Sequence, residues 1–457
     1  MRIIHTRALT KQMKSYSLKV VIVIIGCFHA VTGSYCTGGP KANAKPNLFP
    51  ITTPKIEHVA DYHSKTGGGR LFNAIHTIGN TTFPVLHLYG SGYDMGVAQG
   101  NLLKAKLIKM WDMFFEYLLA NTPGGIKEIE KLLIPLEQHS KPYIPKHFTD
   151  ELQGLADATG YNYTKLLWIH LFPESAAGHC SMFGAWGKAT AKSYNKKLLQ
   201  MRALDYITAD FLSDNHALVV YHPLTGEPYI NIGFIGTITL VTGVSNAKVS
   251  LSQIGVSNPD STFGPQRNGQ GIPFNFLLRD ILQYQTNLND VESALKEATR
   301  TIDLILGFGY GGTMDDMNSK ATLHANIDTP FIGVQYAANQ IRVYDDTNML
   351  PVNKTWHPKI ENVVYHGMDW DCPAWTSLLG KKILEEGYAD GNLTAEGTIR
   401  YVNPIVQTGN LHVVIYEPEN SIFYLSQSVG SKFDGPKYAY ERPYLKLNAT
   451  TFFNVQL

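Results

Sequence analysis

The stretch GHCSMFGAWGKATAKSYNKKLLQMRALDY, residues 178–206, predicts a β-hairpin that begins with a cysteine. Two apolar runs flank a polar, turn-like centre near residue 192. Because paired residues of a hairpin lie about equally far from its turn, Cys180 is expected roughly opposite Arg202 to Leu204, with Arg202 and Asp205 near it on the adjacent strand. A cationic neighbour lowers the pKa of a thiol and favours its thiolate form. The hairpin is therefore a candidate nucleophile site, and a buried apolar cysteine is the alternative.

The N-terminal residues have the pattern of a signal peptide. Residues 20–31 read VVIVIIGCFHAV, with basic residues before them and Gly33 and Ser34 after them. The apolar run is shorter than the ~20 residues that span a bilayer. We expect residues 1–33 to be a signal peptide, with an uncleaved signal anchor as the alternative.

Five Asn-x-Ser/Thr sequons follow this segment. In a chain that enters the secretory pathway they predict a secreted or lysosomal glycoprotein. The five asparagines are Asn80, Asn162, Asn353, Asn392 and Asn448.

The cysteine count is odd once the signal peptide is removed. Cys27 lies within residues 1–33, which leaves Cys36, Cys180 and Cys372. In an oxidising compartment one thiol is then left over. Three pairings are possible, and one of them keeps the thiol on Cys180.

Composition excludes several classes of function. The 457 residues carry a net charge of +1, which gives no electrostatic case for binding nucleic acid. The segment Gly307–Gly312 matches a dinucleotide fingerprint by letter, but TMDDMNSK after it does not predict the helix such a motif needs. Neither His-Glu-x-x-His nor Cys-x-x-Cys occurs. We expect no metal and no cofactor.

The periodicity of the chain indicates an α+β protein. Residues 34–60 are predicted to be an extended lead-in and residues 83–90 a strand, but the first third is otherwise mostly helical, with apolar residues at helical spacing. After Cys180 the chain becomes a series of short strands, interrupted by helices at 273–285 and 288–300. Helices that flank two blocks of strands predict a layered architecture.

Several of these segments resemble one known family. The Cys…Arg-x-x-Asp spacing of GHCSMFGAWG…MRALDY is similar to that of N-terminal-nucleophile hydrolases of the acid ceramidase and penicillin acyltransferase group, most of all the acid-ceramidase-like secreted proteins. Further similar segments are GSGYDMGVAQGNLLKAKL (90–107), DELQGLADATG (150–160), GFIGTITLVTGVSNAKVSLS (233–252), PFNFLLRDILQ (273–283) and YDDTNM (344–349). The resemblance implies a four-layer αββα sandwich.

The resemblance also implies a maturation step. Such enzymes cleave themselves before the nucleophile, here between His179 and Cys180. The expected products are a helical fragment, 34–179, and a catalytic fragment, 180–457. The freed α-amino group, with an ordinary pKa near 8, serves as the base for its own thiol. The thiolate then attacks an amide carbonyl and forms a thioester.

Particular residues match the family's functional positions. Arg202 corresponds to the arginine that contacts the nucleophile, and Asp205 to the aspartate that organises the amine and the arginine. Asn348 is the expected oxyanion donor, with a turn asparagine as the alternative and Asn326 as the second choice. Gln253 falls where relatives carry Asn or Glu, so it is either a further donor or an exposed glutamine.

The implied function is a secreted or lysosomal amidase that hydrolyses an N-acyl lipid, ceramide-like, or a related N-acyl amide. An acyltransferase, or a binding or structural glycoprotein without turnover, is the alternative. If Cys180 stays a thiol, Cys36 and Cys372 are expected to form a disulfide. We expect a small-molecule or lipid amide as substrate and peripheral contact with lipid membranes, with no nucleic acid and no partner protein.

Overall fold

The computed structural model describes residues 39–457 with seven internal gaps. The gaps are 79–80, 176–177, 257–262, 265–268, 313–328, 350–353 and 369–371. The predicted signal peptide, Cys36, Asn80, Asn326 and Asn353 lie outside the described residues. Among the helices that are described, none has the length and apolar character needed to cross a bilayer.

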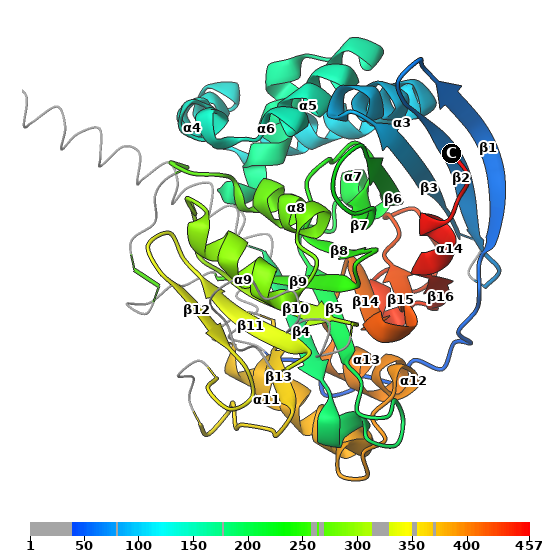
Figure 1. Ribbon diagram of the computed structural model, residues 1–457, viewed down its shortest axis with the longest axis vertical. Coiled ribbons are helices and arrows are strands. Elements are labelled where there is room, and N and C mark those ends of the chain that lie inside the picture. Colours follow the sequence, from blue (N-terminus) through cyan, green and yellow to red (C-terminus); the bar gives the residue numbers. More distant parts are fainter. Residues whose placement is uncertain are drawn as a thin grey trace, which may run out of the picture.

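A ten-stranded sheet forms the larger half of the fold (Figure 1). In spatial order its strands are β1 (Lys55–His63), β2 (Gly68–His76), β3 (Thr81–Gly90), β6 (His216–Pro223), β7 (Tyr229–Phe234), β8 (Thr242–Ser245), β9 (Val249–Gly255), β10 (Leu304–Tyr310), β11 (Phe331–Tyr336) and β12 (Ile341–Tyr344). Neighbouring strands are antiparallel except β3 and β6, which are parallel. The sheet therefore joins strands from both sides of Cys180.

A second sheet of six antiparallel strands carries the cysteine hairpin at its centre. Its spatial order is β13 (Val363–His366), β4 (His179–Ala185), β5 (Leu199–Asp205), β14 (His412–Glu417), β15 (Ile422–Gln427) and β16 (Leu445–Asn448).

Helices cover the outer faces of both sheets. Over the large sheet lie α3 (Gly92–Asn121), α4 (Ile126–Ser140), α5 (Lys146–Thr159), α6 (Tyr163–Leu171), α8 (Phe274–Tyr284) and α9 (Leu288–Glu297) (Figure 1). Against the small sheet lie α11 (Pro373–Ile383), α12 (Ala395–Gly397) and α13 (Asn403–Val406). The short helices α7 (Asp210–Ser213) and α14 (Ala449–Phe453) complete the set among the described residues.

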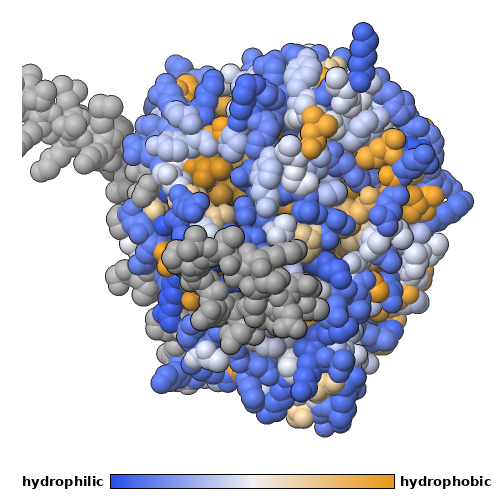
Figure 2. All heavy atoms as spheres, in the orientation of Figure 1, coloured by the Kyte–Doolittle hydropathy of each residue, from blue (hydrophilic) through white to orange (hydrophobic). Residues whose placement is uncertain are grey.

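Alternation along single strands shows how the layers are held together. In β6, Val219 and Tyr221 belong to the core shared with the helices, whereas Leu218 and Val220 face the core between the sheets. Successive side chains of a strand point to opposite faces, so one strand serves two cores. The result is the predicted αββα sandwich. Polar side chains cover most of the face in Figure 2, with apolar side chains in separate clusters.

The N-terminal region contains more strand than the sequence indicates. The predicted strand at 83–90 is part of β3, and the helical region is confirmed over Gly92–Leu171. However, β1 begins at Lys55, within the predicted lead-in, and β2 follows it. Most residues of β1 are exposed, so its sequence lacks the apolar alternation that predicts a half-buried strand.

Helix α3 begins with a capping box. The Ser91 side chain accepts a hydrogen bond from the Asp94 amide at 3.2 Å, and the Asp94 carboxylate accepts one from the Ser91 amide at 3.1 Å. The apolar face predicted from spacing is buried, and the helix ends at Asn121, directly before the Thr-Pro-Gly-Gly segment that predicts its end. Residues from this face of α3 later line the candidate site.

Gly307 of the GFGYGG segment serves packing between the sheets. Gly307 lies in the middle of β10, and a Cβ atom there would come within 2.6 Å of both Met182 Sδ and the Phe331 ring. Gly307–Tyr310 are strand, whereas a dinucleotide-binding motif places its glycines in the loop between a strand and a helix. The fingerprint is therefore a structural feature of β10.

We predict that Gly307→Ala destabilises the protein by about 1–3 kcal/mol, because the added methyl group overpacks the space between the sheets. Gly397→Ala is the control, since its Cβ would come no closer than 3.2 Å to a neighbouring atom. Denaturant unfolding measures both. Equal stability of the two variants would show that the sheets can separate without cost at this point.

Candidate functional site

Cys180 is the second residue of the central hairpin. In the pairing of β4 with β5 it lies opposite Leu204, and Met182 lies opposite Arg202. The predicted register and turn centre are therefore confirmed. Strands β13 and β5 flank β4, and Cys180 is completely buried.

Arg202 reaches the thiol from the adjacent strand. Its Nη2 atom lies 3.5 Å from Cys180 Sγ and donates a hydrogen bond to the Gln253 carbonyl at 3.3 Å. Both side chains project from the face of the small sheet that packs on the large sheet, where β9 supplies Gln253. The cation predicted beside the cysteine is present.

No carboxylate of the described residues neutralises this guanidinium. Arg202 is completely buried, and within the described part of the chain no Asp or Glu oxygen lies within 4.0 Å of it. Its Nε and Nη1 atoms have no hydrogen-bond partner there. A buried charge without a partner is costly, so the ionised thiol of Cys180 is the natural counter-ion.

Asp205 lies on the opposite face of the hairpin and is bound by a loop. It accepts hydrogen bonds from the Thr408 hydroxyl at 2.6 Å, the Gly409 amide at 2.8 Å and the Asn410 amide at 2.9 Å. Burial raises the pKa of Asp205, and these three donors oppose that shift. The structure thus places Asp205 near the Cys180 end of β5, as predicted, but does not join its charge to Arg202.

A chain of hydrogen bonds links Asp205 to the start of β4. The Thr408 hydroxyl lies 2.6 Å from the Ser181 hydroxyl, which accepts from the Met368 amide at 2.7 Å. The Met368 carbonyl accepts from the Cys180 amide at 3.0 Å. Met368 has a φ of 65°, a left-handed conformation that is uncommon for a residue with a side chain. Strained backbone of this kind is concentrated at functional sites.

His412 lies on β14, on the other side of Leu204 from Cys180. It pairs with Leu204, and its Nε2 atom lies 2.9 Å from the Thr242 hydroxyl. Burial, together with the positive charge of Arg202, lowers the pKa of His412 well below its ordinary value. The imidazole is therefore neutral and adds no charge to the site.

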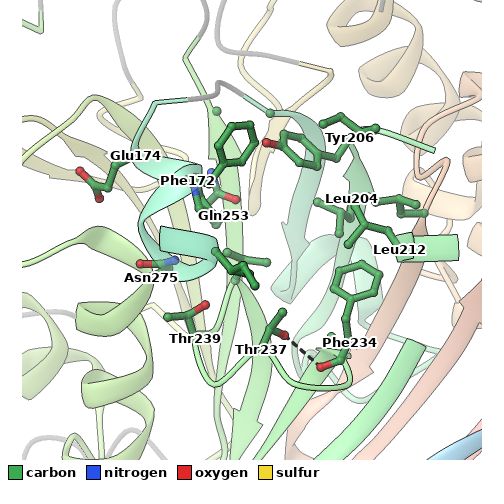
Figure 3. A pocket seen from close by; sticks show the side chains of 18 of the residues that line it. Phe172, Glu174, Leu204, Tyr206, Leu212, Phe234, Thr237, Thr239, Gln253 and Asn275 are labelled. Carbon is green, nitrogen blue, oxygen red and sulfur yellow. Dashed lines mark hydrogen bonds between the residues drawn. The ribbon is translucent and has the colours of Figure 1, made fainter. Parts of the chain in front are cut away.

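Cys180 lines a mostly apolar cavity of about 360 Å³. Aromatic and aliphatic side chains from several elements line it, among them Trp111, Phe114, Ile169, Phe211 and Phe234. Figure 3 shows Phe172, Gln253 and Tyr206 around one part of the cavity and Leu212 and Phe234 at another. Its size and lining are those of a small-molecule site.

The two amide side chains predicted for the oxyanion have different positions. Gln253 is 6% exposed and lines the cavity with Cys180, so the expectation of an exposed glutamine is wrong. Asn348 is exposed and does not line the cavity; its Oδ1 accepts from the Asp345 amide at 2.8 Å. The structure therefore gives Asn348 the role of a turn asparagine, which is a correction to its assignment as an oxyanion donor.

Ser181, Thr408 and Met368 are the site residues that the sequence did not indicate. Their contacts join segments about 200 residues apart, and no spacing rule connects them. One signal was available: Thr408-Gly409-Asn410 combines a hydroxyl, a glycine and a turn-forming residue just before the apolar run LHVVIY (411–416). Gly409 has a φ of 91°, and a Cβ there would meet Val413 Cγ2 at 2.2 Å.

Other predicted positions are compatible with their expected modifications. Asn162, Asn392 and Asn448 are exposed. Asn162 and Asn448 cap helices through side-chain oxygens, which leaves the amide nitrogen of each for a glycan. Cys372 is disulfide-bonded and Cys180 is not. Because Cys36 lies outside the described residues, its pairing with Cys372 stays a prediction.

Comparison with known proteins gives distant relatives. No protein-family model matches the chain. It is 28% identical over 411 residues to protein dcd1A of Dictyostelium discoideum, which covers 81% of this chain and 86% of that one. Protein dcd1B of the same organism is 28% identical over 406 residues, covering 81% of this chain and 75% of that protein.

Two solved structures show a weaker likeness. The Caenorhabditis elegans N-acylethanolamine-hydrolyzing acid amidase ortholog matches with a TM-score of 0.37 and 13% identity, covering 59% of this chain and 100% of that one. The R18L variant of conjugated bile acid hydrolase from Clostridium perfringens matches with a TM-score of 0.34 and 10% identity, covering 59% and 97%. Because these TM-scores are low, the fold rests on the strand order described above.

We predict that Thr408→Val lowers the free energy of unfolding by about 1–3 kcal/mol, because it removes a donor from buried Asp205 and a partner from Ser181. Thr408→Ser keeps the hydroxyl and is the matched control. Denaturant unfolding compares the two variants. If valine and serine are equivalent, the hydrogen-bond chain does not hold the loop.

A pH effect is predicted for Glu174, which lines the cavity. Its carboxylate accepts from the Phe274 amide at 2.7 Å, and burial raises its pKa to about 7. The folded protein then binds this proton more tightly than the unfolded chain, so stability falls as pH rises from about 4.5 to 7. We expect Glu174→Gln to reduce that fall, measured as melting temperature against pH. Glu116→Gln, at an exposed site, should leave it intact; identical slopes in both variants would contradict the assignment.

Proposed function

We propose that the chain is a cysteine-dependent amide hydrolase that cleaves itself before Cys180 and then acts on N-acyl amides. The observation that carries the proposal is a buried thiol 3.5 Å from an unneutralised guanidinium, at the wall of an apolar cavity. A cation at this distance favours the thiolate, which is the nucleophilic form. The predicted family resemblance is consistent with this chemistry.

In the proposed self-cleavage, Cys180 Sγ attacks the carbonyl carbon of His179. The new C–S bond forms as the C–N bond breaks, and the thiol proton ends on the released amine. Water then hydrolyses the thioester, giving a carboxylate on His179 and restoring the Cys180 thiol. The reaction needs no cofactor.

The amine released in this way gains a role in turnover. The Cys180 nitrogen already donates to the Met368 carbonyl, which the Ser181–Thr408–Asp205 chain supports from behind. After cleavage, the hydrogen bond to the Met368 carbonyl would orient the free α-amino group of Cys180 toward the Cys180 thiol, and the amine would take the thiol proton. The acyl thioester would then pass to water, with Gln253 as an oxyanion donor.

The apolar lining of the cavity favours a substrate with an apolar acyl group. Transfer of a hydrocarbon chain into this aromatic wall is favourable, at about 25 cal/mol per Å² of apolar surface. A lipid amide, ceramide-like or shorter, therefore fits the proposed class. The signal-peptide pattern and the sequons favour a secreted or lysosomal glycoprotein, in which a Cys36–Cys372 disulfide can persist.

The first test asks whether the chain cleaves itself before Cys180. Purified wild-type protein should give two bands on denaturing, reducing electrophoresis, and the smaller N-terminal fragment should end at His179. N-terminal sequencing of the other should read Cys-Ser-Met. Cys180→Ala should remain one chain. A wild-type chain that hydrolyses N-acyl amides without cleavage contradicts the proposed maturation.

The two fragments should stay together after cleavage. Strand β3 of the N-terminal fragment pairs with β6 of the other, and α3 shares a core with both sheets. We therefore expect one complex in size-exclusion chromatography under native conditions, even with reductant. Dissociation by reductant alone would mean that the disulfide, rather than the shared sheet, holds the fragments.

Turnover provides the second test. With a fluorogenic N-acyl amide, Arg202→Gln should lower kcat/KM by about 10²-fold or more, because it removes the charge beside the nucleophile. Arg202→Lys should recover part of this loss. Normal secretion and melting temperature separate catalysis from folding. Full activity in a folded Arg202→Gln protein would remove this residue from the mechanism.

A further inference from the structure

A second cavity also borders α3 but shares no lining residue with the Cys180 cavity. It has a volume of about 600 Å³ and is bounded by α3, the start of β3, the end of β15 and the loop between β15 and β16. Five charged side chains line it: Lys106, Lys109, Asp214, Lys432 and Arg442. No step of the proposed function uses this cavity.

Arg442 is the buried cation of this cavity. It is 4% exposed, and it donates to the Gln427 carbonyl at 2.9 Å, the Pro436 carbonyl at 3.0 Å and the Thr81 hydroxyl at 3.5 Å. Its guanidinium carbon lies 4.6 Å from the centre of the Phe433 ring. Within the described residues no carboxylate oxygen lies within 4.0 Å of its nitrogen atoms, and the groups to which it donates are neutral.

The remaining lining groups leave the cavity positive. Lys106, Lys109 and Lys432 are exposed and form no ion pair within the described part of the chain. The carboxylate of Asp214 accepts a hydrogen bond from the Gly430 amide at 2.8 Å. Four cations therefore face one carboxylate.

The two histidines of the cavity do not change this balance. Burial, and next the charge of Arg442, lower the pKa of His216 to about 3. Burial also lowers the pKa of His76, with Arg442 contributing. Both imidazoles are neutral near pH 7.

We infer that this cavity binds a phosphate or sulfate group, with Arg442 as its buried anchor and Lys106 and Lys109 at its mouth. A guanidinium presents several donors in a plane and matches such an oxyanion, while lysines add point charges. The ligand supplies the counter-charge that the protein does not give to Arg442. The Thr81 hydroxyl adds a donor beside the guanidinium.

Inorganic phosphate is the first probe. Calorimetry and thermal melting of the full chain should show phosphate binding and stabilisation that chloride at equal ionic strength does not give. Lys106→Gln/Lys109→Gln should weaken phosphate binding about tenfold, because it removes two exposed positive charges at the mouth of the cavity. Lys104→Gln/Lys127→Gln, which changes two lysines outside the cavity, is the matched control and should bind as wild type.

Arg442 variants test the anchor. Arg442→Gln should abolish the stabilisation by phosphate, and Arg442→Lys should keep part of it. If Arg442→Gln does not fold, the lysine pair still decides the matter. The inference is overturned if phosphate is no better than chloride in wild type, or if the lysine pair and its control bind phosphate equally.

Two further probes distinguish the sources of the group. Glycerol 3-phosphate presents a soluble monoester, and vesicles containing phosphatidic acid present the same group on a lipid surface. Binding of the soluble ester that is lost in the lysine variant supports a soluble ligand. Vesicle binding lost in the same variant supports a lipid headgroup. Binding of neither probe, with phosphate also inert, contradicts the site.

Discussion

The contact between the Arg202 guanidinium and the Cys180 sulfur is the interaction on which the account of this protein depends. Arg202 is buried between two sheets with no carboxylate within reach in the described part of the chain. Such a charge is tolerated in a sandwich core when a neighbouring group can take the opposite charge. The thiol is 3.5 Å away, on the adjacent strand of the same hairpin. The hairpin register therefore sets both the charge and the reactivity of the site.

The two faces of this hairpin have separate tasks. Cys180 and Arg202 face the large sheet and the apolar cavity, whereas Ser181 and Asp205 face the loop that contains Thr408. Strand alternation makes this division unavoidable, since neighbours along a strand point in opposite directions. On the Ser181 face, Met368, whose backbone is left-handed, binds the Cys180 amide and so positions the backbone of Cys180. On the Cys180 face, Arg202 supplies the positive charge. Cleavage before Cys180 would free an amine at the start of β4, between these two faces, without separating fragments that share the large sheet.

Some of this architecture could be predicted from the sequence and some could not. The hairpin register followed from a polar turn between two apolar runs, and the start of α3 from its apolar spacing and position after a strand. These signals are local. Strand β1 was missed because it is mostly exposed and lacks alternation. Asn348 was misplaced because a Thr-Asn pair in a turn resembles one in a site. Thr408, which donates to Asp205 across 203 residues of chain, leaves no local pattern at all.

The pH dependence of Cys180 alkylation tests the central contact most directly. Iodoacetamide reacts with the thiolate, so its rate against pH reports the ionisation of Cys180 in the folded wild-type protein, with Cys180→Ala as the blank. If Arg202 stabilises the thiolate, the rate should reach half its plateau well below the ordinary thiol pKa of ~8.5, and Arg202→Gln should move that midpoint upward by at least one pH unit. A midpoint at or above ~8.5 that does not change in the Arg202→Gln protein would contradict the account.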